Sequence, residues 1–593
     1  MRCEESMNRR VLCAVLIMLS WGGARAAAEE HYEVIVERGV PAKMRDGVVL
    51  RADIYRPKAE GKFPVLLTRT PYDKRSEIDF GPLAAARGYV VVAQDVRGRF
   101  ASEGEWYTFK YESADGYDTV EWSASLPYAN GKVGMYSGSY VGATQMLAAI
   151  ASPPHLVAIF PQVTASNYHD GWTYQGGAFE LWFGQSWTTG LAMNSLERRV
   201  GGESKASRWD VNLPLSDYPL LSLGTPEGLA KYYFDWLVHP DYDDYWKSLS
   251  IDEHDANIMV PAYHQGGWYD IFLGGTLRNY MHIKARGGSD AARQGQRLLV
   301  GPWFHGPFTG KTGDIDFGPS ARGGEQEFNI NALRLRWFDY VLKGLANGLE
   351  REKPVRIFVM GRNVWRDEED WPLARAQNTR YYLHSQGNAN TLSGDGILSA
   401  AMPAAEPADK YTYDPADPVP TRGGNLCCDN NHEPSGAFDQ RPVEARSDVL
   451  VYSTPALKED VEVTGPITLE LYASSSAVDT DFTGKLVDVW PNGYAQNLTD
   501  GILRARYRRS PEKAELMNPG EIYKLTLDLV ATSNVFLKGH KLRLEISSSN
   551  FPHYDRNLNT GEAQGHTARN VKALNSVYHN GEHPSALILP VVP

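Results

Sequence analysis

The first half of the chain alternates short apolar runs with helix-like segments. Six runs are typical of buried strands: residues 63–70, 88–95, 132–136, 155–164, 258–263 and 297–300. Five segments between or after them are typical of helices: residues 82–87, 114–125, 140–151, 276–285 and 326–345. This order predicts a mostly parallel sheet covered by helices, built from two parts at residues 27–164 and 251–352.

Residues 165–250 interrupt that alternation. They contain six of the 15 tryptophans among helix-like segments that are punctuated by glycine. Because an insertion between two parallel strands emerges at the edge where such sheets bind ligands, we expect a helical lid. Its aromatic side chains either line a pocket or pack the lid onto the core. The candidates for the pocket are Trp172, Trp182 and Trp268.

From residue 353 to the end at residue 593 the pattern changes again. Apolar and polar residues alternate in residues 467–471, 525–529 and 542–546, and turn-forming residues separate these runs. Many short alternating strands with almost no helical pattern predict a β-sandwich.

The N-terminus has the features of an export signal. Arg9 and Arg10 precede an apolar run at residues 11–21, and the Ala-Arg-Ala at 24–26 fits a cleavage site. We expect residues 1–26 to be a signal peptide and the mature protein to be periplasmic or secreted. The run is too short for a membrane span, and no later stretch reaches about 18 apolar residues.

The net charge and the cysteine content argue against nucleic-acid binding and against a metal site. Without the four Arg and two Glu of residues 1–26, the net charge falls from −12 to −14, which disfavours nucleic acid as a partner. The mature chain keeps only Cys427 and Cys428, with no histidine at ligand spacing, so we expect no metal site. Two buried thiols are the expectation, with a vicinal disulfide as the alternative. No cofactor is implied.

Residues 134–142 are typical of a nucleophile elbow. Small residues surround Ser139 between a strand-like run and a helix-like segment, and such a turn pushes a serine hydroxyl out of the backbone. The match to G-x-S-x-G is imperfect, since Ser137 replaces the first glycine and Gly142 comes three residues after the serine.

Two further residues complete a catalytic set in the chain order Ser, Asp, His that is typical of the α/β-hydrolase fold. Asp270 and His305 each follow a predicted strand, although either alone is as often a cap or a loop residue. His264 and His169 are the alternative bases. For the oxyanion we expect the backbone N–H of Tyr140 and the hydroxyl of Tyr72, whose alternative role is packing.

Several motifs resemble those of the cocaine-esterase-like (CocE/NonD) acyl hydrolases, which are related to X-prolyl dipeptidyl-peptidases and α-amino-acid ester hydrolases. They lie at residues 71–74, 95–104, 134–142, 267–270, 301–305, 359–373, 417–424 and 548–556. The resemblance implies an α/β-hydrolase core, a helical lid and a jelly-roll-like β-domain. It also implies Ser139 as nucleophile, His305 as base, Asp270 as its orienting carboxylate, and Tyr72 and Tyr140 as the oxyanion hole.

The substrate follows less directly. No acidic residue adjoins Ser139 to pair with an ammonium group, although Asp170 and Glu180 lie in the predicted lid. We therefore expect a small-molecule ester of a neutral or aromatic acid, with amide, aminoacyl or X-Pro substrates as the alternative. A carbohydrate- or partner-binding protein is the alternative from another class. The oligomeric state stays open, a homo-oligomer included.

Overall fold

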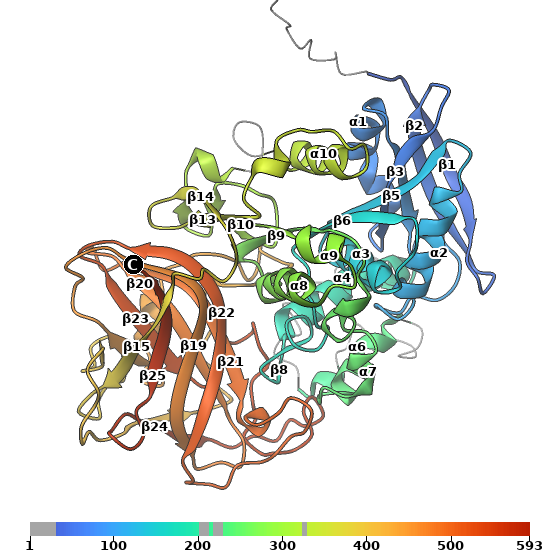
Figure 1. Cartoon of the computed structure of the whole chain (residues 1–593). Helices are drawn as coiled ribbons and strands as arrows, with labels where there is room; N and C mark the ends of the chain where they lie inside the picture. The colour runs from blue at the N-terminus through green and yellow to red at the C-terminus, as the bar shows by residue number, and fades with distance from the viewer. Residues whose placement is uncertain (1–30, 201–212, 218–228, 323–328) are drawn as a thin grey trace, which may run out of the picture.

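The computed structural model describes residues 31–200, 213–217, 229–322 and 329–593. An α/β domain and an all-β domain lie next to each other, with the lid segment between them (Figure 1). The expected signal peptide lies outside the described residues, as does Trp209, one of the six tryptophans of residues 165–250.

A ten-stranded sheet forms the α/β domain. Its strands in spatial order are β1 (Val34–Lys43), β2 (Val49–Pro57), β4 (Val90–Asp95), β3 (Phe63–Thr70), β5 (Ala129–Gly138), β6 (Leu156–Gln162), β9 (Tyr263–Tyr269), β10 (Arg297–Phe304), β13 (Val355–Val359) and β14 (Val364–Glu368). The strands from β4 to β13 run parallel, and the edges carry antiparallel strands. The prediction of a mostly parallel sheet is confirmed.

Helices cover this sheet, as the alternating pattern predicts. They are α1 (Phe80–Ala86), α2 (Glu112–Ala124), α3 (Tyr140–Ile150), α8 (Leu273–Arg286), α9 (Asp290–Gln294) and α10 (Ile330–Val341). The apolar strand residues Val65, Leu67, Val92, Met135 and Ile159 are fully buried beneath them. Removing such side chains from water is the main stabilising contribution to this domain.

One strand lies later in the chain than predicted. The pattern places a strand at residues 258–263 and a loop after it, whereas β9 begins at Tyr263 and continues to Tyr269. The two glycines in β9 look like loop residues in sequence. A Cβ on Gly267 would collide with the backbone oxygen of Trp303, so the glycine is required by the close approach of β10.

The lid is largely helical, as expected. Its helices are α4 (Leu181–Val200), α6 (Lys231–Val238) and α7 (Asp244–Lys247), and a small hairpin joins β7 (Tyr174–Gln175) to β8 (Ala178–Phe179). Within the described ranges, every helix is too short or too polar to span a bilayer.

The all-β domain contains eleven connected strands. They are β15 (Gln377–His384), β16 (Ile397–Ser399), β17 (Asp409–Tyr413), β18 (Leu450–Ser453), β19 (Val461–Ser475), β20 (Asp481–Val489), β21 (Ala495–Arg504), β22 (Tyr523–Phe536), β23 (Lys541–Ser547), β24 (Ala573–Tyr578) and β25 (Ala586–Val592). A Cβ on Gly484 of β20 would lie 2.8 Å from a methyl group of Leu469 in β19, so two layers face each other closely. Minor elements are β11 (Lys311–Thr312), β12 (Ile315–Asp316) and α11 (Arg441–Glu444).

A buried ion cluster joins the lid to the all-β domain. The guanidinium of Arg504 donates to Asp481 at 2.9 and 3.0 Å and to Asp555 Oδ1 at 2.9 Å. The same Asp555 oxygen accepts the backbone N–H of Phe179, in the lid, at 2.8 Å. Burial raises the pKa of Asp481 to about 6 although Arg504 lowers it. The carboxylates therefore depend on this one cation.

We expect Arg504→Ala to lower the free energy of unfolding by about 3–5 kcal/mol, because two buried carboxylates would lose their partner. Urea denaturation followed by tryptophan fluorescence measures the effect. Arg441→Ala is the matched control, since Arg441 pairs with Asp439 at the surface. If the two variants unfold at the same urea concentration, Arg504 does not anchor the lid.

Candidate active site

The backbone of Ser139 is strained at the turn from β5 into α3. Its φ and ψ are 60° and −132°, a conformation that is costly for any residue with a side chain. The turn is held by the backbone N–H of Ser139, which donates to the carbonyl of Gln162 in β6 at 3.0 Å. The carbonyl of Ser139 in turn accepts the N–H groups of Gly142 and Ala143 at 2.9 and 3.0 Å. This is the geometry of a nucleophile elbow.

The position of Gly142 explains the departure from the usual motif. A Cβ at this position would lie 2.8 Å from Thr164 Cβ and 2.9 Å from the carbonyl oxygen of Gln162. The first turn of α3 therefore packs directly on the chain at the end of β6. Only glycine permits this approach.

Ser139, His305 and Asp270 form one hydrogen-bonded chain. His305 Nε2 lies 3.0 Å from Ser139 Oγ, and His305 Nδ1 lies 2.8 Å from Asp270 Oδ2. Asp270 follows β9 directly and is fully buried, and its Oδ1 accepts the backbone N–H of Phe272 at 2.7 Å. This arrangement places the Nδ1 proton toward the carboxylate and leaves Nε2 to accept from the serine hydroxyl.

The two alternative bases lie elsewhere. His264 is buried within β9 and bonds Gln296 at 2.7 Å, and its burial lowers its pKa to about 4. His169 Nε2 bonds the carbonyl of Pro240 at 2.8 Å. Neither histidine has a hydrogen bond to Ser139 in the described part of the chain.

Tyr72 places its hydroxyl beside Ser139, in the loop after β3. The hydroxyl accepts the indole N–H of Trp187 at 2.8 Å, and Arg99 Nε bonds the preceding carbonyl of Pro71 at 2.9 Å. Burial raises the pKa of Tyr72 to about 12, although hydrogen bonds to Trp187 and Ser139 lower it. The phenol is therefore a protonated donor at any working pH.

Tyr140 is the first residue of α3. No residue of its own helix can accept a backbone N–H at that position, so this group is not used within α3. Its side chain points into the protein, where the hydroxyl bonds Glu112 at 3.1 Å and accepts the N–H of Phe109 at 2.8 Å.

An aromatic wall adjoins His305. We use this name for Trp172, Phe183, Trp187 and Phe272. Phe272 meets the imidazole edge-on at 5.1 Å between ring centroids, and Trp172 stacks on Phe272 at 4.3 Å. Trp187 contacts Trp172 and Phe183 at 5.6 and 5.7 Å.

The tryptophan predictions have mixed outcomes. The structure brings Trp172 into the wall, whereas Trp182 is anchored through its backbone N–H to Pro552. Trp268 is a correction: its indole N–H bonds the carbonyl of Phe358 at 2.7 Å, and its ring packs on Trp371. It is a fully buried core residue in a cluster that consists largely of side chains from the all-β domain.

Neither Phe272 nor Trp187 is among the three pocket residues predicted from the sequence. Phe272 comes two residues after Asp270, and Trp187 is one of the lid tryptophans. Proximity to the candidate aspartate was the available signal for Phe272. Nothing in the sequence distinguishes Trp187 from its neighbours.

Cys427 and Cys428 are joined in a vicinal disulfide. The expectation of two buried thiols is therefore wrong, and the alternative holds. A ring nitrogen of His305 lies within 4.8 Å of both sulfur atoms. Cys427 is buried in the same apolar cluster as Trp172 and Trp187, and Cys428 is exposed. The all-β domain thus contributes to the site.

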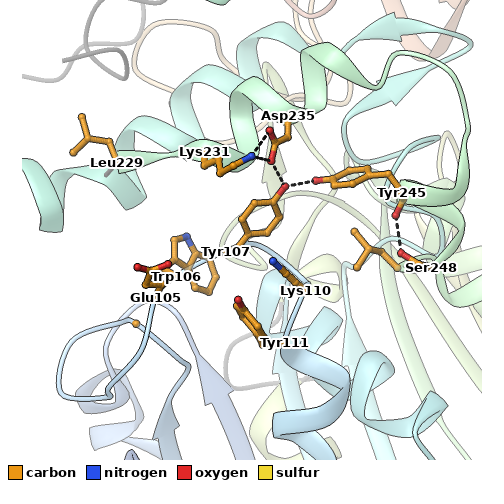
Figure 2. Close-up of a pocket in the computed structure, with 12 residues that line it drawn as sticks. Glu105, Trp106, Tyr107, Lys110, Tyr111, Leu229, Lys231, Asp235, Tyr245 and Ser248 are labelled. Carbon is orange, nitrogen blue, oxygen red and sulfur yellow. Dashed lines mark hydrogen bonds and ion pairs between the residues drawn. The ribbon is translucent and has the colours of Figure 1, made fainter. Parts of the chain in front are cut away.

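A separate cavity of about 610 Å³ lies among Trp106, Tyr107, Lys110, Tyr111 and Asp235 (Figure 2). Trp106 lines it and packs against the Tyr140 ring at 5.2 Å between centroids. The hydroxyl of Tyr107, which also lines the cavity, donates to Asp235 at 2.6 Å and contacts the Tyr245 hydroxyl at 2.9 Å. Neither Ser139 nor His305 lines this cavity, so it is not the space in front of the serine.

The fold and this site define a serine hydrolase of the α/β type. Residues 46–307 match the X-Pro dipeptidyl-peptidase family S15, and residues 347–588 match the X-Pro dipeptidyl-peptidase C-terminal non-catalytic domain. The cocaine esterase of Rhodococcus sp. (strain MB1 Bresler) is 41% identical over 581 residues, which cover 94% of this chain and 98% of that protein. The chain belongs to the cocaine-esterase-like family of serine hydrolases, which act on esters.

Two solved structures agree with this assignment. An aminopeptidase from a marine sediment Thaumarchaeota archaeon superposes with a TM-score of 0.82 at 27% identity, covering 95% of this chain and 97% of that one. An α-amino acid ester hydrolase superposes with a TM-score of 0.80 at 26% identity, covering 98% and 100%.

We expect Gly142→Ala to lower esterase activity strongly, because the new Cβ displaces α3 from β6 and moves the serine hydroxyl. A shift of about 1 Å at a reacting group costs about 10²-fold in rate. Initial rates on p-nitrophenyl acetate measure this. Gly190→Ala is the control, because a Cβ there meets nothing within 4 Å. Equal rates for the two variants would contradict the packing role of Gly142.

Proposed function

We propose that this protein is an exported esterase that hydrolyses esters of neutral, aromatic carboxylic acids through a covalent Ser139 acyl-enzyme. The observation that carries the proposal is the hydrogen-bonded chain from Ser139 through His305 to buried Asp270, placed against the aromatic wall.

Acylation begins at the serine hydroxyl. As Ser139 Oγ attacks the ester carbonyl, its proton moves to His305 Nε2, which already lies 3.0 Å away. Asp270 stabilises the imidazolium that forms and keeps the ring in the productive orientation through Nδ1. Because Phe272 N–H occupies the other carboxylate oxygen, Asp270 cannot rotate freely.

The tetrahedral intermediate needs donors for its oxyanion. The hydroxyl of Tyr72 and the backbone N–H of Tyr140 are the two groups on either side of Ser139 that can supply them. When the intermediate collapses, His305 returns the proton to the leaving alcohol. A water molecule then attacks the acyl-enzyme by the same route in reverse, and the free acid leaves.

The charges near the site favour a neutral acyl group. An unpaired carboxylate would be needed to bind a substrate ammonium. The two acids that the sequence placed in the lid are already paired: Asp170 lies 3.1 Å from Arg278, and Glu180 lies 3.3 Å from His553. A neutral aromatic acyl group needs no such partner and gains from contact with apolar side chains.

Export is part of the proposal. The disulfide between Cys427 and Cys428 supports an oxidising compartment, such as the periplasm or the medium, because cytosolic thiols are kept reduced. Cell fractionation with antibody detection tests this. Recovery of the full-length chain in the cytosol would contradict it.

We expect p-nitrophenyl benzoate to be cleaved faster than aminoacyl or X-Pro p-nitroanilides, because Asp170 and Glu180 are already paired and leave no partner for a substrate ammonium. A series of p-nitrophenyl esters of increasing acyl size measures the preference through kcat/KM. Ser139→Ala is the control and should lose all turnover while keeping its circular dichroism spectrum. Cleavage of the anilides alone would make the protein a peptidase or amidase. No cleavage of any substrate would favour the binding-protein alternative.

We expect Tyr72→Phe to lower kcat by about 10²–10³-fold with little change in KM, because the donor acts mainly on the oxyanion. Stopped-flow or steady-state kinetics on the best ester measure this. Tyr494→Phe is the control, since its hydroxyl contacts Asp314 at the surface of the all-β domain. A Tyr72→Phe enzyme with the wild-type kcat would assign this tyrosine to packing.

A further inference from the structure

The disulfide beside His305 brings together three groups that bind soft metal ions. The donor atoms of Cys427, Cys428 and His305 all lie within 4.8 Å of one another. Around a tetrahedral zinc ion, with bonds of about 2.0–2.3 Å, donor atoms lie roughly 3.3–3.8 Å apart. Opening the disulfide would let the two sulfur atoms move apart toward that spacing, and a ring nitrogen of His305 already lies within 4.8 Å of both.

His305 already has the hydrogen-bonding arrangement that is common among metal-binding histidines. Its Nδ1 is bonded to buried Asp270 at 2.8 Å, so Nε2 is the nitrogen that remains for a metal. A carboxylate behind the imidazole fixes the ring and raises its basicity, which is the common outer arrangement at zinc sites. The catalytic residues thus supply one of the three ligands, His305, together with the carboxylate that orients it.

The disulfide keeps this site closed, because a disulfide sulfur offers no thiolate. Reduction by an external dithiol would transfer two electrons and two protons, break the bond between the sulfurs, and leave the dithiol as its own disulfide. Metal binding would then release both thiol protons to solvent. Cys428 is exposed, so both the reductant and the ion can reach the pair.

We propose that the reduced enzyme binds a thiophilic divalent ion of the Zn²⁺ type through Cys427, Cys428 and His305 Nε2, and that this ion stops hydrolysis. The inhibition rests on the proposed role of His305 as base, since a metal on Nε2 prevents it from accepting the Ser139 proton. Binding of the ion does not depend on that catalytic role. The disulfide of the oxidised enzyme protects the enzyme from inhibition.

Co²⁺ binding tests the site without any substrate. The full-length mature protein is reduced with dithiothreitol, freed of it by anaerobic gel filtration, and titrated with Co²⁺ and then Zn²⁺. We expect one equivalent of Co²⁺ to give a thiolate-to-cobalt charge-transfer band that Zn²⁺ removes. The unreduced protein should give none. The absence of the band after reduction, with two free thiols counted by Ellman's reagent, would overturn the proposal.

Two histidine variants identify the third ligand. Loss of an outer-shell partner alone costs about 10–100-fold in metal affinity, so His305→Ala should weaken Zn²⁺ binding by roughly 100-fold or more. His432→Ala is the matched control, because His432 follows the cysteines in the same loop and bonds Asp429 at 2.6 Å. Wild-type affinity in His305→Ala, or weakened binding only in His432→Ala, would overturn the assignment. Cys427→Ser and Cys428→Ser should each lose the band.

Activity then tests the inhibition. Stoichiometric Zn²⁺ should abolish ester hydrolysis by the reduced enzyme, and EDTA should restore it. Inhibition of the unreduced enzyme at the same Zn²⁺ concentration would overturn the protective role of the disulfide. Full activity of reduced enzyme with Zn²⁺ bound would show that the ion does not occupy His305 Nε2.

Discussion

The strained backbone of Ser139 is the constraint on which the rest of the site depends. Its conformation persists because β6 holds the turn from one side, through the carbonyl of Gln162 and the contact with Gly142. In the sheet order β5-β6-β9-β10, strands β9 and β10 come directly after β6, so their C-terminal ends lie beside this turn. Asp270 and His305 follow those two strands directly, so three residues far apart in the chain meet at one edge of the sheet.

The site is not complete within the α/β domain. The lid supplies Trp172 and Trp187, and the all-β domain supplies the disulfide beside His305. A buried ion pair joins the lid to the all-β domain. Arg504 binds Asp555, and Asp555 also accepts the backbone N–H of Phe179 in the lid. The C-terminal domain is therefore a structural part of the site, and loss of its position would alter the space in front of the serine.

Sequence reasoning predicts the parts of this molecule that have a local signal. Alternating apolar runs identify the parallel sheet, and the chain order of Ser139, Asp270 and His305 identifies residues that the structure joins by hydrogen bonds. The predicted limits of the strand β9 were wrong because its two glycines are typical of a loop in sequence. The choice among tryptophans failed for Trp268, since the face that a side chain occupies depends on tertiary packing. The closeness of Cys427 to His305 has no local signal at all.

Trp187 has two roles at once. Its ring forms part of the aromatic wall, and its indole N–H orients the hydroxyl of Tyr72. If Tyr72 is the oxyanion donor, as proposed, an acyl group that displaces the Trp187 ring also turns that donor away from the developing charge. Selectivity among acyl groups is then expressed as differences in turnover between substrates that bind equally well. A poor substrate of this kind behaves as a competitive inhibitor of a good one.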